Sequence, residues 1–372
     1  MGSIVEKDSG RSSIGNVLII GNQSLSSTIV HALSHNPSLR ISVLTSPSQT
    51  PPTLSHSHSH PQITHKTTDF SPPSLRTAFA HQDLIISTIS GGDYALQTRI
   101  INAAVSAGVP RFIPHEFGPD SLNLRVQDRL PPAAERARVI RYLRGMQNEP
   151  EHPSTVPSPP SASINGCGEH CTHDHSLTAE DSGVEVEISS GFSAPFSWVA
   201  IACGCILDAK LTSGDLGFHL KWQSATIHGD GSERFAATSL AYVGQIVASV
   251  IEKWDDDRVR NRYLCVSGTV TTANEVIECL MEKTGKEWEV GYVEVGECVK
   301  EGRRRIETGW PDAGMFLMEK SVLVDEEVSA VEGFISGEGR AVLGLGEENV
   351  VDVVERAVED FGVNGKGDCG CS

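Results

Sequence analysis

Short apolar runs alternate with stretches of helical spacing along residues 16–146. The run Asn16–Gly21 is apolar and ends in glycine, which is typical of a buried parallel strand. Similar runs predict further strands, and apolar residues spaced along one face predict helices between them. We expect strands at 16–21, 40–44, 63–67, 83–87 and 111–113, and helices at 26–34, 94–107 and 131–144. This alternation indicates βαβ units, and therefore a Rossmann-type α/β fold with a doubly wound parallel sheet.

The pattern changes after residue 146, where Pro, Ser, Gly and His replace the periodic apolar residues. We interpret 147–182 as a flexible insertion. Residues 183–361 regain apolar periodicity and are expected to complete the sheet and add a smaller C-terminal α+β substrate domain to the Rossmann domain of 16–146. Strands are expected at 197–201, 225–228 and 262–266, and helices at 239–254, 272–283 and 348–361. The ends, 1–15 and 362–372, are predicted to be disordered tails.

The balance of charge restricts the partners. The chain has 30 Lys and Arg against 48 Asp and Glu, a formal net charge of −18. Nucleic acids and anionic membrane surfaces need a basic face, so we expect neither as a partner. The sequence has no apolar run of membrane-spanning length and no signal-peptide pattern at its N-terminus, which favours the cytoplasm. Nine cysteines, an odd number without a secretion signal, favour free thiols. The oligomeric state stays open.

The turn after the first strand is where a Rossmann fold binds a pyrophosphate, on the amides that open the first helix. Here it reads Gly21-Asn-Gln-Ser-Leu-Ser26. Only Gly21 matches the pattern G-x-G-x-x-G, because Gln23 and Ser26 stand at the second and third glycine positions. After the second strand comes Ser46, with neither an acid for a ribose hydroxyl nor an arginine for a 2′-phosphate. The turn fits a nucleotide site and equally an ordinary strand-to-helix connection.

A more specific signal follows the fourth strand. The segments Ser87–Gly92 and Ala107–Asp120, the second of which contains Glu-Phe-Gly, resemble the isoflavone reductase-like (NmrA-like) family, an atypical short-chain dehydrogenase/reductase group. The resemblance resumes beyond the insertion at Trp198–Gly204 and at Thr271–Trp288. It covers most of the chain outside the insertion and the tails.

The resemblance implies an N-terminal domain that binds NADPH and a smaller domain that closes a substrate pocket over the nicotinamide. NADP is therefore the expected cofactor. By position, Ser46 would occupy the place of the arginine that binds the 2′-phosphate. The other residues implied along the cofactor are Gly21, Gln23 and Ser26 at the pyrophosphate, Ser90 and Gly91 after the fourth strand, and Phe117 and Gly118 beside the nicotinamide.

Two residues are candidates for the chemistry. Family reductases carry a proton-transferring lysine on the helix after Glu-Phe-Gly, and the resemblance places Arg136 there. Arginine does not give up its proton in proteins, so Arg136 could stabilise an oxyanion but not act as a general base; the alternative is a solvated helix arginine. His115 stands where the family has a small hydroxyl residue. We hypothesise that it is the acid/base group, and the alternative is a histidine hydrogen-bonded at the sheet rim.

Two other groups of residues have side chains that could bind a ligand: clustered cysteines and histidines for a metal, and aromatic residues for a small molecule. Cysteines and histidines gather at 167–175, and histidines alternate at 56–60, but both stretches are of low complexity, so no metal site is predicted. Four aromatic residues of the second half favour an apolar pocket for a small molecule, although core packing would explain them equally well. They are Phe196, Trp198, Phe218 and Trp222.

Three functions agree with these features. The first is an NAD(P)H-dependent oxidoreductase of isoflavone reductase-like type, acting on a small aromatic or polyketide-like molecule of secondary metabolism. The second is an NmrA-like regulator that senses dinucleotide without turnover, and the third is a non-redox isomerase or cyclase using the same pocket. The altered glycine turn, Ser46 and Arg136 count against the first. The aromatic residues favour a small-molecule role over regulation alone.

Overall fold

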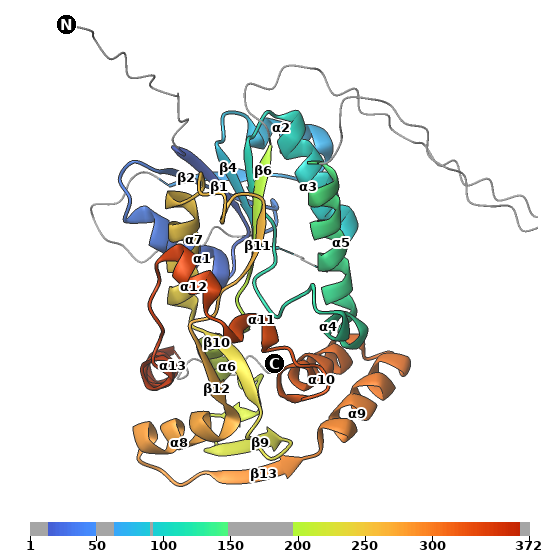
Figure 1. Ribbon diagram of the computed structural model, residues 1–372, viewed down its shortest axis with the longest axis vertical. Coiled ribbons are helices and arrows are strands. Elements are labelled where there is room, and N and C mark those ends of the chain that lie inside the picture. Colours follow the sequence, from blue (N-terminus) through green and yellow to red (C-terminus); the bar gives the residue numbers. More distant parts are fainter. Residues whose placement is uncertain (1–13, 50–62, 90–91, 148–195, 365–372) are drawn as a thin grey trace, which may run out of the picture.

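The computed structural model describes residues 14–49, 63–89, 92–147 and 196–364. Its centre is a seven-stranded parallel sheet in the order β11-β6-β5-β4-β1-β2-β3 (Figure 1). The strands are β1 (Asn16–Ile20), β2 (Arg40–Thr45), β3 (Thr64–Thr67), β4 (Leu84–Ser87), β5 (Arg111–Ile113), β6 (Ser197–Ala202) and β11 (Arg262–Cys265). The strand order reverses between β1 and β4, where a doubly wound sheet leaves a ligand-binding crevice at its carboxyl edge. The predicted fold class is confirmed.

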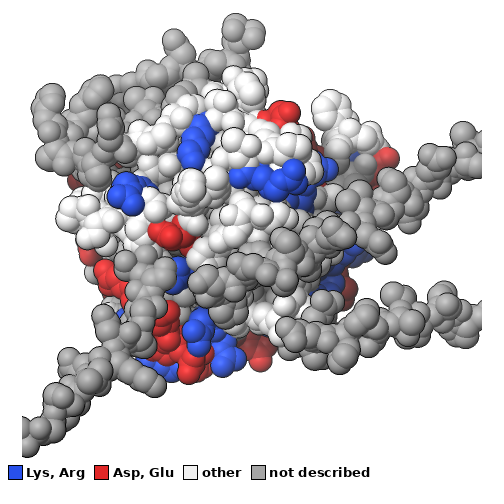
Figure 2. Space-filling view, turned by 90° about the horizontal axis from the view of Figure 1, so that it is seen from above, with Lys and Arg blue, Asp and Glu red and all other residues white. Residues whose placement is uncertain are grey.

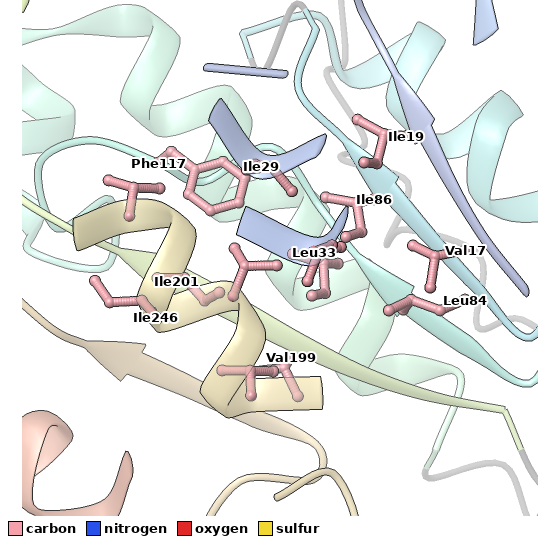
Figure 3. Close-up of a cluster of buried hydrophobic side chains, with 14 of the residues drawn as sticks. Val17, Ile19, Ile29, Leu33, Leu84, Ile86, Phe117, Val199, Ile201 and Ile246 are labelled. Atoms are coloured by element: carbon pink, nitrogen blue, oxygen red, sulfur yellow. The ribbon is translucent and has the colours of Figure 1, made fainter. Parts of the chain in front are cut away.

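Helices cover both faces of this sheet, which is why the inner strands β1, β4 and β6 are buried along almost their whole length, whereas the edge strand β3 is polar and largely exposed. Val17 and Ile19 of β1 pack in one core with α1 (Ser24–Ser34) and α7 (Leu240–Glu252), as Figure 3 shows. Leu18 and Ile20, one residue out of step, pack in the opposite core. The helices on that side are α2 (Pro72–Phe79), α3 (Tyr94–Ser106) and α5 (Pro131–Gly145).

A smaller domain lies beyond the sheet, in the lower part of Figure 1. It contains two three-stranded sheets, β12-β10-β7 and β13-β9-β8. Their strands are β7 (Cys205–Ile206), β8 (Phe218–His219), β9 (Ser224–His228), β10 (Arg234–Thr238), β12 (Thr269–Thr272) and β13 (Glu289–Val293). The accompanying helices are α6 (Leu207–Ser213), α8 (Ala273–Thr284), α9 (Val295–Glu307), α10 (Pro311–Val324), α11 (Glu332–Ile335), α12 (Glu338–Leu343) and α13 (Val350–Asn364). The expected α+β domain is therefore present.

Helix α10 is anchored to the first domain through α4 (Leu124–Arg129). Its Met318 and Val322 pack against Val126 of α4 in a shared apolar cluster. Arg129 completes the anchor: its Nη2 atom lies 2.8 Å from the Asp325 carboxylate, and its Nη1 atom donates to the Ser321 hydroxyl at 3.0 Å. With this face of α10 fixed, its remaining side chains border the space beside β5.

Several predictions fall outside the described residues. The proposed insertion at 147–182 lies there almost entirely, as do most residues of the two tails. The domain limits drawn from composition therefore stay predictions. Within the described residues, no helix is long and apolar enough to cross a membrane.

Charge on the face seen from above is mixed. Figure 2 shows Lys and Arg side chains among uncharged residues, with Asp and Glu also present. The net charge of −18 remains the reason why nucleic acid is not expected as a partner, and this expectation stays a prediction.

Candidate functional site

The turn between β1 and α1 depends on Gly21. Its φ of +134° is a backbone conformation that is essentially restricted to glycine. A Cβ atom here would lie 2.3 Å from Oγ1 of Thr88, the residue after β4. Thr88 is itself fixed, because both its amide and its hydroxyl donate to the carbonyl of Ile20. The first glycine of the motif is therefore required by the close approach of β1 and β4.

The two replaced glycines lie at the start of α1. Gln23 is the residue before the helix; its side chain is exposed and makes no capping hydrogen bond. Ser26 is buried, and its hydroxyl donates to the Gln23 carbonyl at 2.7 Å. The Gln23 side chain makes no capping bond to the first amides of α1, the groups on which a Rossmann fold binds a pyrophosphate. The Ser26 hydroxyl is occupied within the turn, and only the backbone of this residue is suited to contact phosphate.

The end of β2 offers a weaker contact. The Ser46 amide donates to Oε1 of Gln49 at 3.1 Å, and the Ser46 hydroxyl lies 3.1 Å from that of Ser48. The sequence from 46 to 62 contains no lysine or arginine. A 2′-phosphate at this strand end would therefore meet hydroxyl groups instead of a guanidinium. The other implied cofactor residues, Ser90 and Gly91, lie outside the described residues.

Phe117 connects the sheet to a cavity. It is 8% exposed and packs in the core with Ile29 of α1, as Figure 3 shows. The next residue, Gly118, receives two hydrogen bonds on its carbonyl, from the amides of Cys203 at 3.0 Å and Gly204 at 2.9 Å. These two residues link β6 to β7, so the loop after β5 is bonded to the junction between the domains. Phe117 also lines the cavity on that side.

The cavity has a volume of about 170 Å³ and lies between the loop after β5 and helices α6 and α10. Its wall is mostly apolar, with Phe117 on one side and Phe316 of α10 on the other. The remaining apolar side chains include Ile206, Leu216 and Leu323. A hollow with apolar walls and few polar groups is typical of a site for a small molecule.

Four charged residues also line this cavity, and they are unequally paired. The Lys210 ammonium lies 3.2 Å from Glu319 and 3.6 Å from Asp215. Burial alone would lower the pKa of Lys210, but the two carboxylates outweigh it and raise the pKa. Among the described residues, no carboxylate lies within ion-pair distance of Lys320. Its Nζ atom lies 4.2 Å from the centre of the Phe316 ring, a cation–π arrangement.

A second charged group lies behind the loop. Nε of Arg136 is 3.6 Å from Oε1 of Glu116, with side-chain exposures of 13% and 1%. Glu116 also accepts a hydrogen bond from the Tyr263 hydroxyl at 3.1 Å. The Nη2 atom of Arg136 lies 3.9 Å from where a Cβ atom of residue 118 would be, and Arg136 does not line the cavity. The interpretation of Arg136 as a solvated helix residue is therefore wrong, because the side chain points inward.

Burial is the largest influence on the pKa values of Glu116 and its neighbour His115. It raises the pKa of Glu116 to about 7, against the opposing effects of Arg136, Ser121 and Tyr263. Burial, assisted by the charge of Arg136, lowers the pKa of His115 to about 4. The Nδ1 atom of His115 is buried without a hydrogen-bond partner among the described residues, so the alternative of a hydrogen-bonded rim histidine finds no support at this atom. His115 is a neutral imidazole near pH 7, and Glu116 is the group that titrates there.

The four aromatic residues of the second half do not form the pocket. Trp198 and Phe218 are buried in two different cores, and Phe196 packs against the core that contains Trp198. Trp222 is 72% exposed and lies under the Lys221 ammonium. Core packing explains three of them, and the predicted pocket is instead formed by Phe117 and Phe316. Trp198 lies on β6, a strand that is buried on both faces, so its side chain packs into the core of the sheet and does not line the cavity.

Metal binding was not expected, and the structure tests this only in part. The Cys and His residues of 167–175 and 56–60 lie outside the described residues. Elsewhere, among the residues that are described, no three His, Cys, Asp or Glu side chains come together as metal ligands would.

The sequence interpretation missed three residues that the structure brings to the site. Glu116 belongs to the Glu-Phe-Gly segment, and its place beside His115 could have drawn attention. Tyr263 lies 147 residues after Glu116, and Lys320 lies still further along the chain, on α10. No local pattern connects either of them to β5. The predicted pair of His115 and Arg136 does come together, on the far side of the loop from the cavity.

A parallel sheet with a strand-order reversal and a glycine-dependent first turn define a Rossmann-type α/β protein, and a cavity lies beside β5. Residues 27–156 match the NmrA-like family. Oxidoreductase aprR of Aspergillus flavus is 30% identical over 285 residues, which are 76% of this chain and 78% of that protein. The chain belongs to the NmrA-like family, as the resemblance implied.

Solved structures show the same fold. An isoflavone reductase superposes with a TM-score of 0.60 at 17% identity, covering 92% of this chain and 99% of that one. A leucoanthocyanidin reductase from Vitis vinifera, solved with NADPH, gives a TM-score of 0.62 at 13% identity, covering 93% and 100%. The architecture is therefore that of isoflavone reductase.

Proposed function

We propose that this protein is an NAD(P)H-dependent reductase of a small aromatic molecule. The observation that carries the proposal is spatial: the open start of α1 and the aromatic cavity beside Phe117 lie at the same carboxyl edge of one sheet. The Aspergillus flavus relative is an oxidoreductase and the Vitis vinifera neighbour was solved with NADPH, and both facts support the proposal. A bound nicotinamide would supply a hydride, and the protein would supply orientation.

The residues present fit most of a dinucleotide. Gly21 permits the close approach of β1 and β4 at the turn, and the amides after Gln23 and around Ser26 would form the pyrophosphate end. Ser46 would take the adenosine end, Ser90 and Gly91 the middle, and Phe117 the nicotinamide end. The weakest part of the fit is Ser46, which brings no positive charge to a 2′-phosphate.

Arg136 and His115 take supporting roles in this proposal. Arg136 keeps its charge beneath Gly118 and would stabilise negative charge that develops nearby. His115, with its pKa lowered to about 4, would exchange protons weakly at pH 7 and would mainly offer a hydrogen bond. Replacing His115 with Gln tests the stronger hypothesis, since an unchanged turnover number would end its role as the acid/base group.

Titration with NADPH and NADH, followed by fluorescence or calorimetry, tests the proposal. We expect saturable binding of at least one of them, and loss of the reduced-nicotinamide absorbance when an aromatic carbonyl compound such as benzaldehyde is added. The absence of binding would overturn the assignment and would favour a non-redox isomerase or cyclase.

A regulatory function is the second candidate. Two observations favour it: Ser46 offers no cation to a 2′-phosphate, and Arg136 cannot release a proton where family reductases have a lysine. An NmrA-like sensor would bind dinucleotide and show no turnover with any carbonyl compound.

A further inference from the structure

Neither Arg136 nor Glu116 can donate a proton to a substrate in the cavity. Reduction of a carbonyl group needs a proton for the oxygen as well as a hydride for the carbon. Arg136 stays protonated and does not line the cavity. Glu116 is 1% exposed and is also absent from the cavity wall. His115 is likewise absent from the cavity wall. If the proposed reduction takes place in this cavity, we expect the proton to come from a group that lines it.

We propose that Lys320 binds the substrate oxygen in the cavity and donates the proton to it. Lys320, Phe117 and Phe316 line the same cavity, and the Lys320 ammonium lies over the Phe316 ring, so a small aromatic carbonyl compound bound there would share the cavity with the lysine. The inference rests on the proposed reductase function. It adds a residue of the smaller domain as a catalytic group and defines the substrate as an aromatic carbonyl compound.

The neighbours of Lys320 make it suitable for this role. Lys210, the other lysine of the cavity, is held by both carboxylates, which leaves Lys320 as the ammonium available to a ligand. Its contact with the Phe316 ring holds the charge at the aromatic wall without consuming its hydrogen-bond donors. Burial lowers the pKa of Lys320, which makes its proton easier to transfer.

The charged and titratable groups around Lys320 come from several elements. Asp215 and Cys298 favour the charged form, and Lys210 disfavours it. Lys320 also shares a smaller hollow of about 20 Å³ with His228 of β9, and burial, assisted by the lysine charge, lowers the pKa of that histidine. His228 is therefore mainly neutral at pH 7 and does not compete as a second cation.

The step balances without a further reagent. The carbonyl carbon gains the hydride that the reduced nicotinamide supplies, and the C=O π pair moves to the oxygen. That oxygen takes a proton from Nζ, which leaves an alcohol and a neutral Lys320 amine. The amine then regains a proton from water.

Direct binding gives a test that does not depend on turnover. Benzoate carries negative oxygen atoms on an aromatic ring, and benzamide is its neutral counterpart. In calorimetric titrations we expect Lys320→Met to weaken benzoate by about tenfold or more, the value of one charge-assisted hydrogen bond, and to leave benzamide nearly unchanged. Lys300→Met is the matched control, since Lys300 is 77% exposed on α9. Equal benzoate affinity in all three proteins, or no benzoate binding by the wild type, would overturn the proposal.

Substitution by arginine separates charge from proton donation. Lys320→Arg should still bind benzoate, but its kcat with benzaldehyde and NADPH should fall by about 10² or more, as in Lys320→Met, because arginine does not release its proton. The wild-type kcat should also decline on the alkaline side as Lys320 loses its proton, below the usual lysine pKa of 10.5. Full activity of Lys320→Arg, or no turnover of benzaldehyde by any variant, would contradict the donor role.

NADPH titration keeps the two proposals apart. The Lys320 variants should bind NADPH like the wild type. If the wild type binds no NADPH, the proposed function fails. If the wild type binds NADPH but Lys320→Met binds benzoate as tightly as the wild type does, only the role of Lys320 fails.

Discussion

The two walls of the site are built in different ways. The wall at the sheet edge consists of backbone: the turn at Gly21, the first amides of α1 and the carbonyl of Gly118. The wall at the smaller domain consists of side chains, with Lys210 and Glu319 paired and Lys320 facing the cavity.

This difference explains how the site can differ in sequence from the family pattern and keep its shape. Where the backbone forms the contact, we expect Gln23 and Ser26 to be tolerated in place of glycines, because Gln23 makes no capping bond and the Ser26 hydroxyl bonds within the turn. Where side chains form the contact, one substitution changes the chemistry. We therefore expect the first wall to be sensitive at Gly21 and tolerant elsewhere, and the second to depend on single charges.

The largest effect is expected from Gly21→Ala. The new Cβ would clash with Thr88 in a backbone conformation that alanine rarely adopts, so we expect a loss of about 3 kcal/mol or more in the free energy of unfolding. Dinucleotide binding should disappear with it. Urea denaturation and NADPH titration measure the two effects.

Gly108→Ala is the control for this substitution. Gly108 also has a positive φ, of +75°, but open space surrounds its Cβ position. Its cost should be about 1 kcal/mol, with no effect on NADPH affinity. Equal costs at the two glycines would show that the approach of β1 to β4 is not what requires Gly21.

The group behind the loop should show opposite pH dependences in two variants. Between pH 4.5 and 6.5, folding protonates Glu116, whose pKa rises from 4.5 to about 7, and deprotonates His115, whose pKa falls from 6.5 to about 4. The two effects cancel in the wild type. Relative to it, Glu116→Gln should gain stability as pH rises, and His115→Gln should lose stability as pH rises, each by about 1.4 kcal/mol per pH unit at most. Thermal or urea unfolding across this range checks the signs; parallel curves for all three proteins would refute the assignment.

A smaller effect should follow from adding a charge at the end of β2. Ser46→Arg would place a guanidinium where the 2′-phosphate is expected, so NADPH affinity should rise by about tenfold. NADH, which lacks that phosphate, serves as the internal control and should bind as before. An equal gain for both cofactors would indicate a general electrostatic effect instead.

The smallest effect is expected at the replaced glycine position that faces solvent. Gln23→Ala should change the free energy of unfolding by less than about 0.5 kcal/mol and NADPH affinity by less than about twofold, because the side chain makes no capping bond. Calorimetry with NADPH checks this. A large loss would mean that the Gln23 side chain takes part in binding.

The sheet was predictable because each strand carries its own signal. Val17 to Ile20 are buried on both faces, so a continuous apolar run marks the strand wherever it lies in the fold. The same holds for helix α3, whose limits were predicted to within one residue at its C-terminal end.

Helix α10 escaped prediction for the opposite reason. It packs against α4, α9 and β10, and apolar residues consequently lie on several of its faces, without a single stripe. The cavity depends on this helix, so Lys320 could not be placed. The burial of Arg136 could not be predicted either. The sequence showed arginine where the family has lysine, but not that the guanidinium lies beside Glu116.

The paired hydrogen bonds on the Gly118 carbonyl have a mechanical consequence. The amides of Cys203 and Gly204 belong to the strand junction about which the smaller domain would rotate. A rotation that admits substrate must either carry the Phe117 loop with it or break both bonds. The loop that carries Phe117 into the cavity wall is therefore coupled, through the backbone, to the start of the smaller domain.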